Sequence, residues 1–491
     1  MPMLAQFIWQ HLSEPLRAIP WADWQGFWLA RILDDRFVVV WFLPLLPILL
    51  VLRPHRLRVG LVLSGLTFIA YVFGVAYASL WLLICVGLHR LGEWFATACR
   101  RDPGRRPVYI AAAAILGGYL GTLLLQQVSL PAGWDAWLYD RAPWVFPLGA
   151  RSVAWEPAFA IFRTRLEHGP LPLFAAVFYN PHNIGTAYLL CRMLAYFADL
   201  RRGTVSPERR SALHFLAYVC YAPALIQGPL ERYAVFQDEL DRCHERRGWH
   251  TVLPAVARIG WGIAKSVIAS VYLLPVLWLQ LGMGHSNDYY KHPERIASTW
   301  LLYGGVFLHI FWLYLEFSGY CDVSAGIARL LGYRQVENFR WPWLATSLRD
   351  FWRRWHISLS GILRDYIYIP LGGSRRRMVL NLCLTFAICG AWHPTAVRGA
   401  CWGVVMGLMV ALNHWWSDWM KRLDATPQGW LPMVRRAVLR LQPLPRICAW
   451  VLTQHAFLFS ILVFAGGTAA IRVPWEIARR LWTWWTAGSG P

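Results

Sequence analysis

Long apolar runs without charged residues recur along the chain. Val59–His89 contains no Asp, Glu, Lys or Arg, and neither do Ile296–Leu315, Gly399–Ser417 and Cys448–Ile471. A helix needs about 20 predominantly apolar residues to cross the hydrocarbon core of a bilayer. The pattern therefore predicts an all-α polytopic membrane protein.

Shorter or less regular apolar stretches extend this pattern over most of the sequence. The candidate spans lie at about 37–52, 59–89, 107–129, 171–198, 211–230, 252–283, 296–317, 320–333, 378–394, 399–418 and 448–471. The stretch 59–89 is long enough either for one tilted helix or for a pair of helices.

Two segments differ from the spans because they mix tryptophan with charge. Residues 1–36 carry four tryptophans among charged residues, and Arg472–Trp485 places apolar residues at helical spacing opposite Arg479 and Arg480. Both suit helices that lie along a membrane surface. Residues 130–170 are rich in Pro and Trp and favour an extramembrane or interfacial loop.

The charge balance changes the list of expected partners. The chain carries 48 Lys+Arg against 27 Asp+Glu, a net charge of +21 that would suggest nucleic acid in a soluble protein. Here, however, only 15% of residues are charged, and the basic ones gather in short loops between the apolar runs. Examples are Arg53–Arg58, Arg100–Arg106, Arg201–Gly203 and Arg375–Arg377. This distribution follows the positive-inside rule and predicts a lipid bilayer as partner and no nucleic acid.

The stretch Phe351–Arg377 combines a helical pattern with ionisable groups. From Ser347 to Asp365 two faces are expected on one helix, an apolar one with Leu348, Phe351, Trp352, Trp355, Leu359 and Leu363 and a polar one with Arg349, Arg353, His356 and Ser360. Pro370 and two glycines in Ile369–Gly373 then end the helix. Such a segment suits a re-entrant or tilted helix whose polar groups line a cavity.

Two histidines are the best local candidates for chemistry. His356 lies in this stretch, and His393 closes the apolar run Met378–Trp392. A neutral imidazole can take a proton from a hydroxyl near pH 7. His393 could equally be a hydrogen-bonded structural histidine near a helix end. For His309, His414 and His455, which also lie in apolar runs, the structural role is preferred.

The common motifs of soluble enzymes and metal sites are missing from the sequence. There is no GxSxG, GxxxxGK[ST] or HExxH motif, and no His is followed five residues later by Asp. The ten cysteines form no CxxC pair and lie mostly in apolar runs, which indicates buried hydrophobic residues. One Cys and two His in Cys243–His250 are a weak pattern, so no metal site is predicted.

A long block of sequence resembles a known family. Tyr314–Gly373, with FWRRWHISLSGILRDYIYIPLGG near its end, closely resembles the membrane-bound O-acyltransferase (MBOAT) family, and within it the branch of bacterial alginate O-acetylase membrane subunits. The resemblance continues through Cys389–Gly403 and, more weakly, through Ala195–Gly203 and Ala224–Tyr233. In total the resemblance covers about residues 175–470.

The resemblance implies about ten to eleven transmembrane helices, with re-entrant and interfacial helices, around a central tunnel. Combined with the apolar and tryptophan-rich patterns described above, it predicts four regions: an interfacial N-terminal segment at 1–36, N-terminal transmembrane helices and a loop at 37–170, the catalytic core at 171–471 and an interfacial helix at 472–491.

For the site, the resemblance implies that His393 is the essential histidine and His356 the second one. This sequence has Pro394 where relatives usually carry Gly, and proline disfavours a helical conformation of His393, so we expect the helix to end there. Residues expected to bind substrate or donor are Arg353, Arg354, Ser360, Asn381, Arg375 and Arg376. For the last two, simple anchoring at the membrane surface explains the charge equally well.

The implied activity is transfer of an acetyl group from a cytoplasmic thioester to a hydroxyl of an exported polysaccharide. Acetyl-CoA or another acyl thioester would be a co-substrate, with no permanently bound cofactor. The expected setting is the bacterial inner membrane, with an exported glycan as acceptor and a periplasmic or extracellular esterase-like partner. The alternatives are D-alanyl transfer to teichoic acid, acylation of lipid or protein, and a transporter without chemistry.

Overall fold

The computed structural model describes residues 49–73, 75–104, 106–125, 184–225, 227–273, 292–296, 298–391, 396–425, 429–431, 433–435, 441, 443–466 and 471–488. Within these ranges the secondary structure is helical and contains no strand. The predicted segments 1–36 and 130–170 lie outside the described residues, as does His393.

The chain divides into two compact units that alternate along the sequence. Unit 1 combines Met1–Arg17, Lys265–Ser318 and Glu337–Pro491, and unit 2 combines Ala18–Ala264 and Gly319–Val336. The boundaries of these units differ from those of the four regions expected from the sequence. The four regions remain a prediction.

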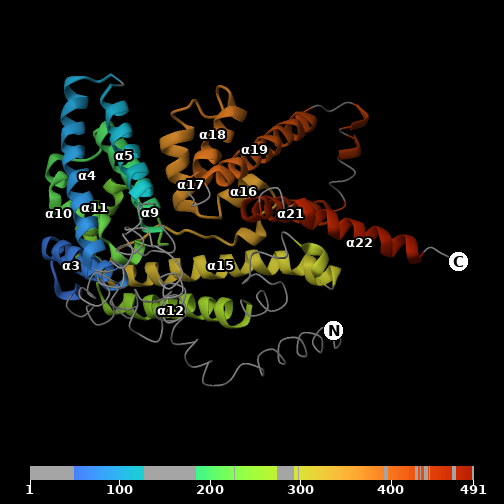
Figure 1. Cartoon of the computed structure of the whole chain (residues 1–491), viewed down its shortest axis with the longest axis horizontal. Helices are drawn as coiled ribbons and strands as arrows, with labels where there is room; N and C mark the ends of the chain where they lie inside the picture. The colour runs from blue at the N-terminus through green and yellow to red at the C-terminus, as the bar shows by residue number, and fades with distance from the viewer. Residues whose placement is uncertain are drawn as a thin grey trace, which may run out of the picture. The chain divides into compact units, whose positions relative to one another are not determined.

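Unit 2 is a bundle of helices with a few short 3₁₀ turns (Figure 1). Its elements are α3 (Pro54–Phe73), α4 (Val75–Arg101), α5 (Arg106–Leu125), α9 (Ile184–Arg202), η4 (Pro207–Arg210), α10 (Ala212–Val219), η5 (Ala222–Ala224), α11 (Tyr233–Arg242), η6 (Cys243–Arg246) and most of α12 (Trp249–Val267). α4 packs against α3, α5, α9 and α10.

Aromatic side chains fill the core of unit 2. Tyr196, Phe215, Tyr218 and Tyr233 are at most 2% exposed, and their rings meet at angles with centroids 4.7–5.2 Å apart. Angled ring contacts place the positive edge of one ring against the negative face of the next. α9, α10 and α11 are therefore joined through one aromatic cluster.

Unit 1 holds the remaining helices. They are η7 (Ile268–Leu273), η9 (Pro293–Arg295), η10 (Pro342–Leu344), α16 (Leu348–Trp352), α17 (Ile357–Leu363), η11 (Arg364–Tyr368), α18 (Met378–Ala391), α19 (Ala396–Ala425), α21 (Leu444–Gly466) and α22 (Arg472–Gly488). α16 packs on α19 and α21. α15 (Thr299–Leu330) begins in unit 1 and ends in unit 2.

α18 and α19 form a tightly packed antiparallel hairpin. Gly399, Gly403 and Gly407 repeat every fourth residue on α19, and a Cβ at Gly403 would lie 2.0 Å from the carbonyl oxygen of Phe386 on α18. Small residues at this spacing let helix backbones approach closely in membranes. The four residues between the two helices, 392–395, include His393.

Several predicted spans differ from the observed helices. The stretch 59–89, predicted as either one tilted helix or a pair of helices, belongs to a pair, α3 and α4. The two runs predicted at 296–317 and 320–333 are one 32-residue helix, α15. The prediction of a span at 211–230 was wrong, because Pro223 and Pro229 cannot donate helix hydrogen bonds and the chain forms the short helix α10 followed by η5.

Three helices among the described residues are long and apolar enough to cross a membrane. They cover Ala78–Arg101, Thr299–Leu330 and Leu444–Phe464. The predicted total of ten to eleven spans remains a prediction.

α22 has the amphipathic pattern expected of the C-terminal segment. Val473 and Glu476 are buried, whereas Trp475, Trp482 and Trp485 are more than half exposed. The acidic side chain of Glu476 accepts hydrogen bonds from Arg479 and Arg480. Its location at a membrane surface remains a prediction.

Candidate functional site

The helix predicted from Ser347 to Asp365 is broken in the middle, at His356. α16 ends at Trp352, and His356 has φ +45° and ψ +52°, the left-handed region that a non-glycine residue seldom adopts. A strained residue of this kind costs about 1–3 kcal/mol. The single polar face expected for Arg349, Arg353, His356 and Ser360 was therefore wrong, because α16 ends at Trp352 and α17 begins only at Ile357, so these residues do not lie on one continuous helix.

Asn338 holds the chain in this broken conformation. Its backbone carbonyl accepts a hydrogen bond from the Ile357 N–H at 3.0 Å, and its Oδ1 accepts one from the Ser358 N–H at 3.2 Å. The first N–H groups of a helix have no partner within the helix. Asn338, eighteen residues earlier in the sequence, provides those partners at the start of α17.

The imidazole of His356 is buried and held by the same asparagine. The side chain is 7% exposed, and its Nδ1 lies 3.2 Å from Asn338 Oδ1. The ring of Phe317, on α15, stands edge-on to the imidazole with the centroids 4.7 Å apart. Phe339 and Trp355 continue this aromatic wall, with centroids 5.1 Å apart. His356 is thus a buried polar group that is held by Asn338 and packed against aromatic rings.

The two arginines beside His356 have different environments. The Arg354 guanidinium pairs with Asp350 at 2.9 Å, and its Nη1 also donates to the Arg340 carbonyl at 3.3 Å. Arg353 is exposed. Ser360 Oγ donates to the Trp355 carbonyl at 3.4 Å. Of these three candidate binding residues, Arg353 has the side chain that a ligand could reach most easily.

Asn381 supports the loop that carries the other two arginines. From its buried position on α18, its Nδ2 donates to the carbonyls of Gly373 at 2.9 Å and Arg376 at 2.7 Å. The helix ends before this loop, as expected from Ile369–Gly373, and Gly372 and Gly373 both have positive φ. Arg375 and Arg376 are exposed. Asn381 therefore holds the backbone of the loop that carries Arg375 and Arg376.

α16 connects the His356 segment to the hairpin that carries His393. Trp352 Nε1 donates to Met406 Sδ at 3.4 Å, and the Trp352 ring lies 5.0 Å from the Phe386 ring. The N–H of Arg349 donates to Asn413 Oδ1 at 3.4 Å. The segment before His356 is thus packed against both helices of the hairpin, within unit 1.

The remaining histidines of the apolar runs have structural partners. His455 Nδ1 lies 2.8 Å from the Val451 carbonyl and its Nε2 lies 2.7 Å from the Tyr303 hydroxyl. His414 Nε2 lies 3.5 Å from Asp418, and His309 packs against Trp312. These contacts fit the structural role preferred for them.

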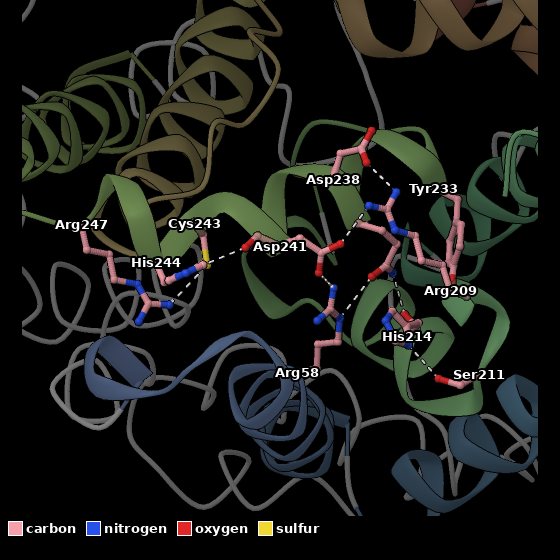
Figure 2. A network of polar contacts seen from close by, with 11 residues as sticks. Arg58, Arg209, Ser211, His214, Tyr233, Asp238, Asp241, Cys243, His244 and Arg247 are labelled. Atoms are coloured by element: carbon pink, nitrogen blue, oxygen red, sulfur yellow. Dashed lines mark hydrogen bonds and ion pairs between the residues drawn. The ribbon is translucent and has the colours of Figure 1, made fainter. Parts of the chain in front are cut away.

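A polar network in unit 2 uses a residue that the sequence placed at the membrane surface (Figure 2). Arg58, in the basic loop Arg53–Arg58, is only 3% exposed; it pairs with Asp241 and donates to Gln237 Oε1 at 3.2 Å. Asp241 also binds Arg209 at 3.0 Å. The network joins α3, η4 and α11, and the charge of Arg58 is paired with a carboxylate within the protein.

No group of three or more His, Cys, Asp or Glu that could hold a metal occurs in the described part of the chain. Cys243, from the weak Cys–His pattern, accepts a hydrogen bond from Arg247 at 3.3 Å.

Sequence reasoning overlooked two buried ionisable residues in unit 2, Arg192 and Glu231. Arg192 is 3% exposed and donates to the Ala224 carbonyl at 2.6 Å and the Tyr218 carbonyl at 3.0 Å. Glu231 is 6% exposed and accepts from the Val336 N–H at 2.7 Å, and burial raises its pKa to about 8. A charged residue inside an apolar run, as Arg192 is, marks such a position in the sequence.

Comparison with known proteins places these residues in a family context. The model of the membrane-bound O-acyltransferase family matches residues 153–462, which include His356, His393, Asn338 and Asn381. A protein of Azotobacter vinelandii named "Probable alginate O-acetylase AlgI" is 32% identical over 256 residues, which cover 51% of this chain and 47% of that protein.

Two other relatives have different named activities. The peptidoglycan O-acetyltransferase of Helicobacter pylori is 28% identical over 50% of this chain and 42% of its own length. The teichoic acid D-alanyltransferase of Bacillus subtilis is 25% identical over 58% of this chain and 70% of its own length. The chain spans about half the length of the alginate O-acetylase relatives it matches. Because the family model covers more than half of the sequence, this chain belongs to the membrane-bound O-acyltransferase family.

Proposed function

We propose that the protein is a membrane O-acetyltransferase. It transfers an acetyl group from a cytoplasmic thioester to a hydroxyl of an exported polysaccharide, directly or through a partner protein. The observation that carries the proposal is the buried His356, held by Asn338 in an aromatic wall within the family-matched segment.

In this mechanism His393 is the general base. It takes the proton of the attacking hydroxyl while the hydroxyl oxygen bonds to the thioester carbonyl carbon. The tetrahedral intermediate then loses the thiolate as the carbon–sulfur bond breaks, and the imidazolium of His393 returns the proton to that sulfur. His356 orients the hydroxyl and assists the proton transfer.

Positive side chains supply the electrostatic part. The exposed guanidinium of Arg353 stabilises the oxyanion, an effect often worth about 3–4 kcal/mol for one donor. Arg375 and Arg376, on the loop shaped by Asn381, bind the phosphates of the thioester donor. Arg354 and Ser360 keep the donor site in shape through their contacts with Asp350 and the Trp355 carbonyl.

The acceptor is inferred from the relatives. The names of the alginate O-acetylase relatives favour an acetylated exopolysaccharide as product. The location in this proposal is the inner membrane, and a periplasmic esterase-like partner completes the transfer. The second candidate is D-alanyl transfer to teichoic acid, favoured by a relative that this chain matches over 70% of its length.

The test compares the wild type with His393→Ala at equal membrane abundance. Membranes receive isotope-labelled acetyl-CoA, and mass spectrometry follows the label into the exported glycans. His414→Ala is the matched control, because His414 also lies on an apolar helix and pairs with Asp418. We expect label in the glycan for wild type and control only.

Transfer that is unchanged in His393→Ala would remove His393 from the mechanism. Absence of acetyl transfer in the wild type, with label from D-alanine reaching the acceptor instead, would favour the second candidate. Passage of a glycan across the membrane without any acyl transfer would point to a transporter.

A further inference from the structure

The position of Asn338 determines which nitrogen of His356 carries the proton. Asn338 is 2% exposed and lies in the segment after α15. Its Oδ1 receives the Ser358 N–H at 3.2 Å and the Ser358 hydroxyl at 2.8 Å. A backbone N–H can only donate, so the side-chain atom at this point is the amide oxygen and not the amide nitrogen.

The same oxygen faces the imidazole. It lies 3.2 Å from His356 Nδ1, and a carbonyl oxygen can only accept. Nδ1 must therefore carry the hydrogen of this bond. In the neutral ring one nitrogen is a donor and the other an acceptor, so Nε2 carries a lone pair.

We propose that Asn338 is a positioning residue that fixes His356 in the Nδ1–H tautomer and so makes Nε2 the proton-accepting atom. The inference rests on the proposed function. It gives His356 a hydrogen-bond accepting atom, Nε2, in the site where His393 takes the proton of the attacking hydroxyl. It also excludes the neutral His356 as the hydrogen-bond donor to the thioester oxyanion, a task left to Arg353.

The backbone supports this assignment. His356 keeps its left-handed conformation because Asn338 binds both Ile357 and Ser358 at the start of α17. One residue thus sets both the direction of the imidazole and its tautomer. In general, the partner of one ring nitrogen decides the protonation of the other.

The experiment measures the tautomer directly. Full-length protein labelled with ¹⁵N-histidine in nanodiscs is studied by two-bond ¹H–¹⁵N correlation, and the His356 signals are identified by their loss in His356→Gln. In the wild type we expect a protonated-type shift for Nδ1 and an unprotonated-type shift for Nε2. Asn338→Leu removes the acceptor, and we expect the Nε2–H tautomer to appear.

Two further variants separate positioning from a general structural role. Asn338→Asp, when ionised, keeps an oxygen that accepts the Nδ1 hydrogen, so we expect Nδ1 to stay protonated in this variant. Ser358→Ala removes the hydroxyl but not the Ser358 N–H, and we expect an unchanged tautomer. In Asn338→Leu we expect kcat to fall at least tenfold with little change in the KM for the donor.

An Nε2–H tautomer in the wild type, or an unchanged tautomer in Asn338→Leu, would overturn the proposal. So would loss of the Nδ1 proton in folded Asn338→Asp protein. Failure of the proposed function looks different: the spectra would be as expected, but neither His393→Ala nor Asn338→Leu would alter acyl transfer.

Discussion

Gly403→Ala should disrupt the α18–α19 hairpin. The added Cβ would lie 2.0 Å from the Phe386 carbonyl oxygen and 2.5 Å from the Ala387 backbone nitrogen. Non-bonded heavy atoms are best separated by about 3.5 Å, so the helices would have to move apart by about 1.5 Å. The obstructing atoms are backbone atoms, which cannot rotate away as a side chain can.

The cost follows from two opposing effects. Overpacking of this kind costs about 1–3 kcal/mol. We expect the upper end because Gly399 and Gly407 also face the α18 backbone, with Cβ positions 2.0 and 2.6 Å from its nearest atoms. Alanine is favoured over glycine in a helix by about 1 kcal/mol, which offsets part of this. A net loss of roughly 2 kcal/mol in the free energy of unfolding is expected.

Gly304→Ala on α15 is the matched control, because a Cβ there meets no atom within 4 Å. It should gain up to about 1 kcal/mol from helix propensity alone. Thermal unfolding in detergent, followed by tryptophan fluorescence, compares the two variants with the wild type. Acetyl transfer should also fall in Gly403→Ala, since the hairpin carries His393. A Gly403→Ala protein as stable and active as Gly304→Ala would refute the close packing of the two helices.

Three further predictions follow from the charged and catalytic residues. Asp241→Asn should lower the melting temperature, with a loss of about 3 kcal/mol in the free energy of unfolding, because it leaves the buried Arg58 without its carboxylate partner. Asp424→Asn, at an exposed position, is the control, and equal melting temperatures for the two variants would contradict the argument. Glu231→Gln should raise the melting temperature between pH 5 and 8. The wild-type carboxyl has a pKa of about 8 in the folded protein, so the wild type is destabilised as the pH rises above the pKa of this carboxyl in the unfolded chain. A difference in melting temperature between variant and wild type that does not vanish toward pH 4 would count against this. His356→Gln should lower kcat by about 10²–10⁴-fold at unchanged abundance in a radiolabelled acetyl-transfer assay, and full activity would remove it from the mechanism.

The sequence predicted the elements that depend on local composition. Uncharged apolar runs indicated α3, α4, α15, α19 and α21, and the Pro-Gly-Gly segment indicated the end of the helix before Arg375. Boundaries were less accurate where a helix continues through small residues, as α15 does at Ser318 and Gly319. Local pattern carries no information on whether packing favours a break there.

The sequence by itself determined that the chain is a helical membrane protein, and its motifs indicated the family and the two histidines. Only the tertiary structure decided how His356 is presented, because its backbone and its Nδ1 depend on Asn338, a residue from another segment. It likewise decided that Arg58 is buried against Asp241, 183 residues away. Hydrophobic periodicity is a property of neighbouring residues, whereas these hydrogen bonds and ion pairs exist only after distant segments have packed together.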